Sequence, residues 1–169
     1  MPAGAPSGGA APNDPARSGV TWAQLSVEVP GLATRVQERF EAHTRHVLAT
    51  RTIIGSPRVS GTPTGWWRGE MWIASPAGAP RGRDLRSDAR FALHSNPGDG
   101  SGPDAKVGGL VVELVRGQQH ADLVEQAQLS GSTDVFLLRL RTVRLAARDH
   151  EREEAGPTRW RVDGDTHRH

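Results

Sequence analysis

The stretch that decides the fold is residues 56–97, SPRVSGTPTGWWRGEMWIASPAGAPRGRDLRSDARFALHSNP. It contains two runs of β-forming residues, the Gly/Pro-rich turn PAGAP, a short arginine-rich segment with helical character and a further apolar run. A compact sheet with a ligand-binding loop is therefore expected here, and the remaining segments are placed around it.

Length and charge limit the classes of protein that the chain can belong to. The 169 residues suffice for one domain with a real core. The 21 basic and 19 acidic side chains leave a formal net charge of only +2, so no nucleic-acid partner is predicted. Cysteine is absent, which excludes disulfides and fits a cytoplasmic protein. No apolar run approaches the roughly 20 residues that cross a bilayer, so no membrane role is predicted.

The two ends of the chain differ in composition from its middle. Residues 1–20 are rich in Pro, Gly and Ala and are predicted to be a disordered tail, and residues 166–169 form a short second tail. The domain is expected to occupy residues 21–165. Near its start, Pro30 precedes a segment in which apolar residues recur at i, i+4 and i+8 from Leu32, which predicts an amphipathic helix.

Short β-forming runs separated by turn residues follow this helix. The runs at residues 46–52 and 58–62 flank the turn sequence IIGSP and are expected to form a hairpin. With the run around Trp66 and the one at residues 71–75, they are expected to form an antiparallel meander of four strands. Alternation in the second run puts Val59 on one face and leaves the opposite face polar and able to meet a ligand.

The second half of the chain adds strands and two short helices. The segment RGRDLRSDAR suits one helix, and a second is expected at residues 120–129. Strands are expected at residues 91–94, 107–115, 135–146 and 158–162. The adjacent Gly108 and Gly109 indicate a bulge or a close approach by another chain. Six or seven antiparallel strands with these helices predict an α+β barrel or sandwich.

Several segments occur together in an order and spacing typical of one family. They are RFEAHTRHVLAT (39–50), GSPRVSGT (55–62), EMWIAS (70–75), RGRDLRSDARFALHSNP (81–97) and DAKV (104–107). In these the chain resembles the pyridoxamine 5′-phosphate oxidase-like family of FMN-binding split β-barrels. The resemblance implies a mostly antiparallel, six-stranded split β-barrel with an N-terminal helix and short helices. It also implies a homodimer with cofactor sites between the subunits, in which the strands at residues 107–115 and 135–146 supply dimer surface.

The resemblance further implies which residues hold the cofactor. In such proteins the strand that contains Arg58 gives a basic side chain and backbone groups to the flavin, and a phosphate favours charge-assisted donors. The family's Ser-Arg-Lys-Ala-like turn corresponds to Ala79-Pro80-Arg81-Gly82, in which arginine replaces lysine and Pro80 removes one backbone donor. The candidate cofactor-binding residues are Arg58, Val59, Ser60, Thr62, Ala74, Ser75, Arg81, Lys106 and Trp160. No catalytic residue and no metal ligand is assigned.

The function implied is a flavoprotein oxidoreductase of the actinobacterial type, which transfers a hydride between a flavin or deazaflavin ring and a small organic substrate. FMN is the first choice of cofactor, 8-hydroxy-5-deazaflavin is the alternative, and haem is a third. Pro63 stands where the vitamin-oxidising enzymes place a basic residue, so pyridoxamine phosphate oxidase activity itself is not expected.

Two other hypotheses for the function stay open. The chain could be a non-catalytic barrel that binds flavin or haem, with His94 or His43 as the axial donor to haem iron. It could also be a cofactor-free barrel that serves as an interaction or biosynthetic partner. His43 and His46 are three residues apart, but no acidic residue nearby completes a zinc site.

Overall fold

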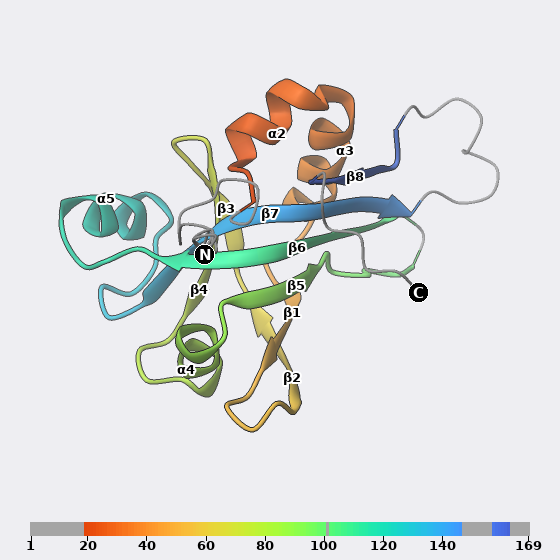
Figure 1. The fold of residues 1–169 in the computed structure, drawn as a ribbon. Helices are drawn as coiled ribbons and strands as arrows, with labels where there is room; N and C mark the ends of the chain where they lie inside the picture. Colours follow the sequence, from red (N-terminus) through yellow and green to blue (C-terminus); the bar gives the residue numbers. More distant parts are fainter. Residues whose placement is uncertain (1–18, 101, 147–156, 163–169) are drawn as a thin grey trace, which may run out of the picture.

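The computed structural model describes residues 19–100, 102–146 and 157–162 (Figure 1). The helices are α2 (Trp22–Glu28), α3 (Pro30–Glu41), α4 (Pro80–Ser87) and α5 (Gln118–Gln126). The strands are β1 (His46–Arg51), β2 (Pro57–Thr62), β3 (Thr64–Trp67), β4 (Glu70–Ser75), β5 (Arg90–His94), β6 (Asp104–Glu113), β7 (Asp134–Ala146) and β8 (Arg159–Arg161). Residues 1–18 of the tail predicted at residues 1–20 lie outside the described part of the chain, as do the residues after 162.

The strands form one curled antiparallel sheet, which confirms the predicted α+β class. The order of its strands is β2-β1-β5-β6-β7-β4-β3, and β8 pairs with β7. The family resemblance implied six strands, whereas the sheet formed by the described residues has eight. The predicted bulge is confirmed between Gly108 and Gly109, where a Cβ on Gly109 would lie 2.0 Å from the carbonyl oxygen of Arg139.

The predicted four-stranded meander is wrong. The β1–β2 and β3–β4 hairpins both form, but they stand at opposite ends of the strand order because β5 pairs with β1 and β7 pairs with β4. Turn residues specify a hairpin from local sequence, whereas the strands inserted between the two hairpins come from later in the chain. Consecutive strands β2 and β3 therefore lie at the two ends of the sheet.

The helices cover the sheet at three places (Figure 1). Helices α2 and α3 pack together above β7 and β8, with Leu32, Val36 and Phe40 of α3 buried, as the periodicity predicts. Helix α2 begins at a capping box in which Thr21 Oγ1 accepts the N–H of Gln24 at 3.2 Å. Helix α5 closes a second apolar cluster, formed by Trp67, Trp72, Ala74, Leu123, Val124, Val135 and Leu137.

Helix α4 is fixed to the β1–β2 hairpin by one buried carboxylate. Asp84 Oδ2 accepts from Thr50 Oγ1 at 2.9 Å and from Arg58 Nε at 2.6 Å, and its side chain is only 7% exposed. A buried charge is tolerated when it is both paired and hydrogen-bonded. These two bonds therefore set the position of the helix against the sheet.

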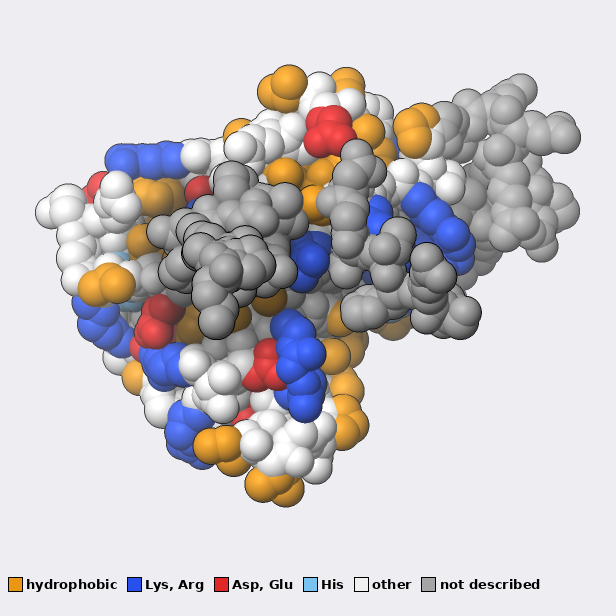
Figure 2. Space-filling view, viewed as in Figure 1, with side chains coloured by type: hydrophobic (Ala, Val, Ile, Leu, Met, Phe, Trp, Pro, Cys, Tyr) orange, Lys and Arg blue, Asp and Glu red, His pale blue; other side chains and the backbone are white. Residues whose placement is uncertain are grey.

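On the face drawn in Figure 2, acidic side chains lie beside groups of basic ones. None of the helices in the described residues is long and apolar enough to cross a membrane.

One buried titratable group makes the stability of the fold depend on pH. His46 is 2% exposed, contacts the ring of Phe40 edge-on, and accepts the backbone N–H of Asn96 on Nδ1 at 3.1 Å. Burial lowers the pKa of His46 to about 4, and the positive charges of His43 and Arg39 act in the same direction. The folded chain therefore keeps this imidazole neutral where the unfolded chain, with a pKa near 6.5, is protonated.

We predict that the free energy of unfolding falls by up to roughly 3 kcal/mol as the pH drops from about 6.5 to about 4, because the unfolded state binds the additional proton. In His46→Gln, which keeps an acceptor for Asn96, this part of the pH dependence should disappear. Urea denaturation at several pH values measures it. Parallel pH profiles for wild type and variant would contradict the assignment.

Candidate functional site

The two ends of the sheet meet where the chain passes from β2 to β3. Thr62 is fully buried, and its Oγ1 donates to the carbonyl oxygen of Ala74 at 2.9 Å and accepts the Ala74 N–H at 3.4 Å. Pro63 interrupts the strand, and Thr64 then pairs with Ile73 of β4. A side-chain hydroxyl thus replaces strand pairing at this point and closes the barrel.

A small hollow lies beside this closure, between Pro63, the end of β4 and the start of α4. It measures about 230 Å³ and is lined by Arg45, Pro63, Ala74, Ser75, Pro76, Arg81, Leu129 and Thr133. We call it the cationic hollow. Pro76 ends β4 directly after Ser75, and Pro80 occupies the first turn of α4, so the chain turns sharply here and brings Arg81 back over the end of β4.

Neither Arg45 nor Arg81, the two arginines of the cationic hollow, is ion-paired to an acidic side chain among the described residues. Arg81 Nη2 donates to the carbonyl oxygen of Ala74 at 3.4 Å, but its buried Nε has no hydrogen-bond partner. Burial lowers the pKa of Arg81, and the nearby charge of Arg45 lowers it further. An anion in the hollow would offset both the cost of burying the charged guanidinium and its repulsion by Arg45.

A larger hollow adjoins the first. It measures about 420 Å³ and is lined by Phe40, Glu41, His43, Thr44, Pro63, Thr64, Gly65, Trp66, Trp72, Ala127 and Leu129. We call it the aromatic hollow. Gly65 stands opposite Trp72 on the paired strand, and a Cβ there would lie 2.7 Å from the indole, so glycine allows that ring to lie across β3.

The two hollows share Pro63 and Leu129 and are therefore neighbours. One offers basic side chains, and the other offers flat apolar rings. Together they suit a ligand that has an aromatic ring at one end and an anionic group at the other.

Comparison with known proteins identifies the fold. No model of a protein family and no curated protein matches the chain. A putative pyridoxamine 5′-phosphate oxidase from Listeria innocua superposes with a TM-score of 0.56 at 12% identity, over 66% of this chain and 95% of that one. An F420 reductase gives a TM-score of 0.50 at 16% identity, over 64% of this chain and 93% of that one.

A heme-binding protein from Mycobacterium smegmatis gives a TM-score of 0.50 at 19% identity, covering 66% of this chain and 53% of that one. The present chain thus spans about half the length of that protein. The chain has the pyridoxamine 5′-phosphate oxidase-like split-barrel fold. At these identities the likeness concerns the fold, and the fold expected from the sequence is confirmed.

The split barrel brings four of the predicted site residues together. Thr62 and Ala74 form the closure, and Ala74, Ser75 and Arg81 line the cationic hollow. Ser75 is buried and donates to the carbonyl oxygen of Pro76 at 3.2 Å. Their role in cofactor binding stays a prediction, but their proximity follows from the fold.

Three of the predicted site residues on β2 lie outside both hollows. Arg58 donates from Nε to Asp84, and Ser60 lies on the same face with a buried Oγ that has no hydrogen-bond partner among the described residues. Val59 points away from that face and is 69% exposed. None of these three side chains lines either hollow.

The remaining two predicted residues lie elsewhere on the barrel. Lys106 is exposed on β6, and Trp160 is buried on β8, where its Nε1 donates to Glu28 at 2.8 Å. Neither lines the two hollows, and the assignment of these residues to a cofactor stays a prediction.

Sequence reasoning missed Arg45, Leu129 and Thr133. Arg45 lies just before β1, and Leu129 and Thr133 lie between α5 and β7. The only available signal for Arg45 was its place within the family-like segment 39–50. No sequence pattern around Arg45 indicates that its side chain approaches Arg81.

Within the described residues, no group of three or more His, Cys, Asp or Glu side chains is placed to hold a metal ion.

We predict that Thr62→Val, which keeps the shape but removes the hydroxyl, lowers the free energy of unfolding by about 1–3 kcal/mol because it leaves the N–H of Ala74 buried and unpaired. Thr62→Ser keeps the hydroxyl and should cost less, about 1 kcal/mol for the lost methyl group. Chemical denaturation of both variants gives the comparison. Equal stability of the valine and serine variants would show that the hydroxyl does not hold the closure.

Proposed function

We propose that the chain binds a flat-ring cofactor with a phosphate-bearing tail, FMN first and 8-hydroxy-5-deazaflavin second, and acts as an oxidoreductase on a small organic substrate. The observation that carries the proposal is the half-buried Arg81 beside the exposed Arg45, neither of them ion-paired to a carboxylate among the described residues, next to a hollow lined by aromatic rings. The split-barrel neighbours, which include a putative oxidase and an F420 reductase, support the same class of activity.

The residues of the cationic hollow fit a phosphate. The buried Nε of Arg81 has no hydrogen-bond partner among the described residues, and Arg45, which lines the same hollow, donates to the carbonyl oxygen of Gly61 at 3.3 Å. The Ser75 hydroxyl adds a neutral group at the end of β4. A phosphate between these side chains would supply counter-charge and acceptors to both guanidinium groups.

The residues of the aromatic hollow fit a planar ring. Its lining includes the half-buried indole of Trp66 and the edges of the largely buried rings of Trp72 and Phe40, and its volume of about 420 Å³ lies within the range of small-molecule sites. Trp66 Nε1 is buried and has no hydrogen-bond partner within the described part of the chain, which leaves one donor for a ring heteroatom. These side chains would hold the ring flat and keep water from one side of it.

A flavin or deazaflavin supplies the two-electron chemistry of the proposed reaction when bound. The role of the protein in this proposal is to bind and orient the cofactor. The arginines would hold its tail, and the tryptophans would hold its ring against the barrel. FMN is placed first because a single phosphate matches the small volume of about 230 Å³ of the cationic hollow.

We also propose the homodimer that the sequence indicates. The outer face of the sheet carries a row of small or apolar residues, since Val59 pairs with Ala49, Ala49 with Ala92, and Ala92 with Gly108. Val59 and Ala92 are exposed. A second copy would cover this surface, and cofactor sites between subunits would follow from it.

One observation favours haem as a second candidate. His43 lines the aromatic hollow and could act as an axial donor there, whereas His94 is engaged with the carbonyl oxygen of Ser95 at 2.6 Å. The fold likeness to a heme-binding protein supports this alternative. The absorbance spectrum of the purified protein separates the two, because haem gives a Soret band and flavin does not.

We predict that Arg81→Gln weakens FMN binding by about tenfold to a hundredfold, the value expected for one charge-assisted hydrogen bond of about 1.5–3 kcal/mol. The matched control is Arg83→Gln, because Arg83 is an exposed arginine on the same helix that donates to the carbonyl oxygen of Gly78. Its affinity should stay within twofold of wild type.

Flavin fluorescence titration of the three proteins gives the dissociation constants. If Arg81→Gln and Arg83→Gln bind FMN equally, the cationic hollow is not the phosphate site. If the wild type binds neither FMN nor the deazaflavin, the proposed function is wrong.

A further inference from the structure

The segment between α5 and β7, residues 127–133, forms a wall that the two hollows share. Ala127 and Leu129 line the aromatic hollow, and Leu129 and Thr133 line the cationic hollow. Besides its two arginines, the described lining of the cationic hollow has two hydroxyl groups, those of Ser75 and Thr133. We call residues 127–133 the shared wall.

The shared wall begins at a defined end of helix α5. The backbone N–H of Gln128 donates to the carbonyl oxygen of Glu125 at 3.1 Å, and that of Leu129 donates to the carbonyl oxygen of Val124 at 2.9 Å. Gln128 has a φ of 53°, in the left-handed region. This is a Schellman motif, in which an apolar residue just after the helix often contacts the last turn. Leu129 packs against the apolar cluster that contains Val124, so the helix end sets its position between the hollows.

Thr133, at the other end of the shared wall, is held by both of its backbone groups. Its N–H donates to the carbonyl oxygen of Ser130 at 2.9 Å. Its carbonyl oxygen lies 2.8 Å from Nε2 of His120, a buried side chain on α5. Because a carbonyl oxygen can only accept, the imidazole donates this bond. Thr133 is 9% exposed, so these bonds fix it in a largely buried position.

Arg116 holds the residues between these two ends. It donates to the carbonyl oxygens of Gly131 and Ser132, both at 2.8 Å, and to the carboxylate of Asp134 at 3.1 Å. Asp134 is buried at the start of β7 and also pairs with Arg86 of α4 at 2.9 Å. The shared wall is therefore tied to α4 and β7 before any ligand binds, and groups held in this way lose little conformational freedom on binding.

The hydroxyl of Thr133 is the polar group that these contacts leave available. Its backbone N–H and carbonyl oxygen are both engaged, and within the described part of the chain its Oγ1 makes no hydrogen bond. The Ser75 hydroxyl, by contrast, already donates to the carbonyl oxygen of Pro76 at 3.2 Å. A phosphate has three strong acceptor oxygens, so it can take a hydroxyl donor in addition to guanidinium donors.

We propose that Thr133 binds the cofactor by donating its hydroxyl to the phosphate that Arg45 and Arg81 hold. The inference rests on the proposed function, since it requires a phosphate in the cationic hollow. The donors come from three parts of the fold: Arg45 precedes β1, Arg81 lies on α4, and Thr133 precedes β7. A tetrahedral phosphate can accept from several sides at once, whereas a planar carboxylate accepts mainly near its own plane. Thr133 therefore favours a cofactor tail that ends in phosphate.

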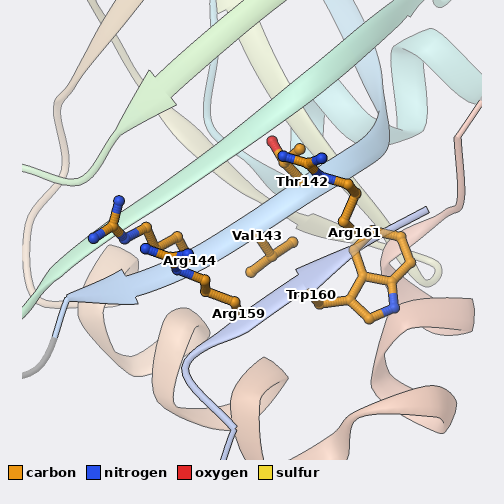
Figure 3. A pocket seen from close by; sticks show the side chains of 6 residues that line it. All are labelled: Thr142, Val143, Arg144, Arg159, Trp160 and Arg161. Carbon is orange, nitrogen blue, oxygen red and sulfur yellow. The ribbon is translucent and has the colours of Figure 1, made fainter. Parts of the chain in front are cut away.

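A third hollow supplies a matched control. It measures about 440 Å³ and lies against β7 and β8, where Figure 3 shows threonine and arginine side chains on neighbouring strands. Its lining, which shares no residue with the shared wall or with the other two hollows, is Thr142, Val143, Arg144, Arg159, Trp160 and Arg161. Thr142→Val thus removes a threonine hydroxyl beside arginines at a place where we expect no cofactor phosphate.

Flavin fluorescence titration with FMN and with riboflavin tests the inference, because only FMN carries the phosphate. Thr133→Val keeps the branched shape and removes the hydroxyl. Its dissociation constant for FMN should rise about tenfold, the effect of one hydrogen bond to a charged group, while its affinity for riboflavin stays within twofold of wild type. Thr133→Ser keeps the hydroxyl and should bind FMN within threefold of wild type, and Thr142→Val within twofold.

The melting temperature without ligand separates binding from folding. Thr133→Val should melt at the temperature of wild type, because the hydroxyl that it removes makes no hydrogen bond to the described part of the chain. If the valine variant does not fold, Thr133→Ala takes its place in the same comparison, with the same expected loss of FMN affinity alone.

Four results would overturn the inference. They are unchanged FMN affinity in Thr133→Val, an equal loss of FMN and riboflavin affinity in that variant, a loss in Thr133→Ser as large as in Thr133→Val, and a loss of FMN affinity in Thr142→Val, which would place the phosphate in the third hollow. A wild type that binds no FMN would overturn it as well, and the proposed function fails with it if the deazaflavin does not bind either. FMN binding that Arg81→Gln weakens and Thr133→Val leaves unchanged contradicts this inference alone.

Discussion

The hydrogen bonds between the Thr62 hydroxyl and the backbone of Ala74 close the barrel, and the rest of the site depends on them. Strands β2 and β3 are consecutive in sequence but stand at opposite ends of the sheet, so the chain must cross from one end to the other within a single residue, Pro63. Proline cannot continue the strand ladder. Both hollows have Pro63 in their lining, and their arrangement side by side follows from this crossing.

A second constraint acts on helix α4. The Asp84 carboxylate holds the helix to Thr50 and Arg58, and this places Arg81 over the end of β4 near a second arginine. Burial and a like charge both disfavour a charged guanidinium there. A site that binds an anion is the physical explanation that we favour.

Much of the fold could be predicted from the sequence, because the signals are local. The helix from Pro30, the β1–β2 hairpin and the Gly108–Gly109 bulge each follow from turn chemistry or periodicity over a few residues. The strand order could not be predicted in this way. It depends on which later strands enter between the two hairpins, and local propensity carries no information on that choice.

The site was predictable only in part for the same reason. Alternation along β2 correctly separated Val59 from Arg58 and Ser60, but a period of two does not say what each face meets. The polar face meets Asp84 of α4, which is 26 residues further along the chain from Arg58. Arg45 was missed because only the closed barrel brings it near Arg81.

The central claim is that the cationic hollow holds the phosphate of a cofactor whose ring lies in the aromatic hollow. Comparing FMN with riboflavin by titration calorimetry tests it most directly, because the two ligands share the ring and differ by the phosphate. The account predicts that FMN binds about a hundredfold more tightly, since the phosphate alone would meet both arginines. Equal affinity for the two ligands, or no affinity for either, would contradict it.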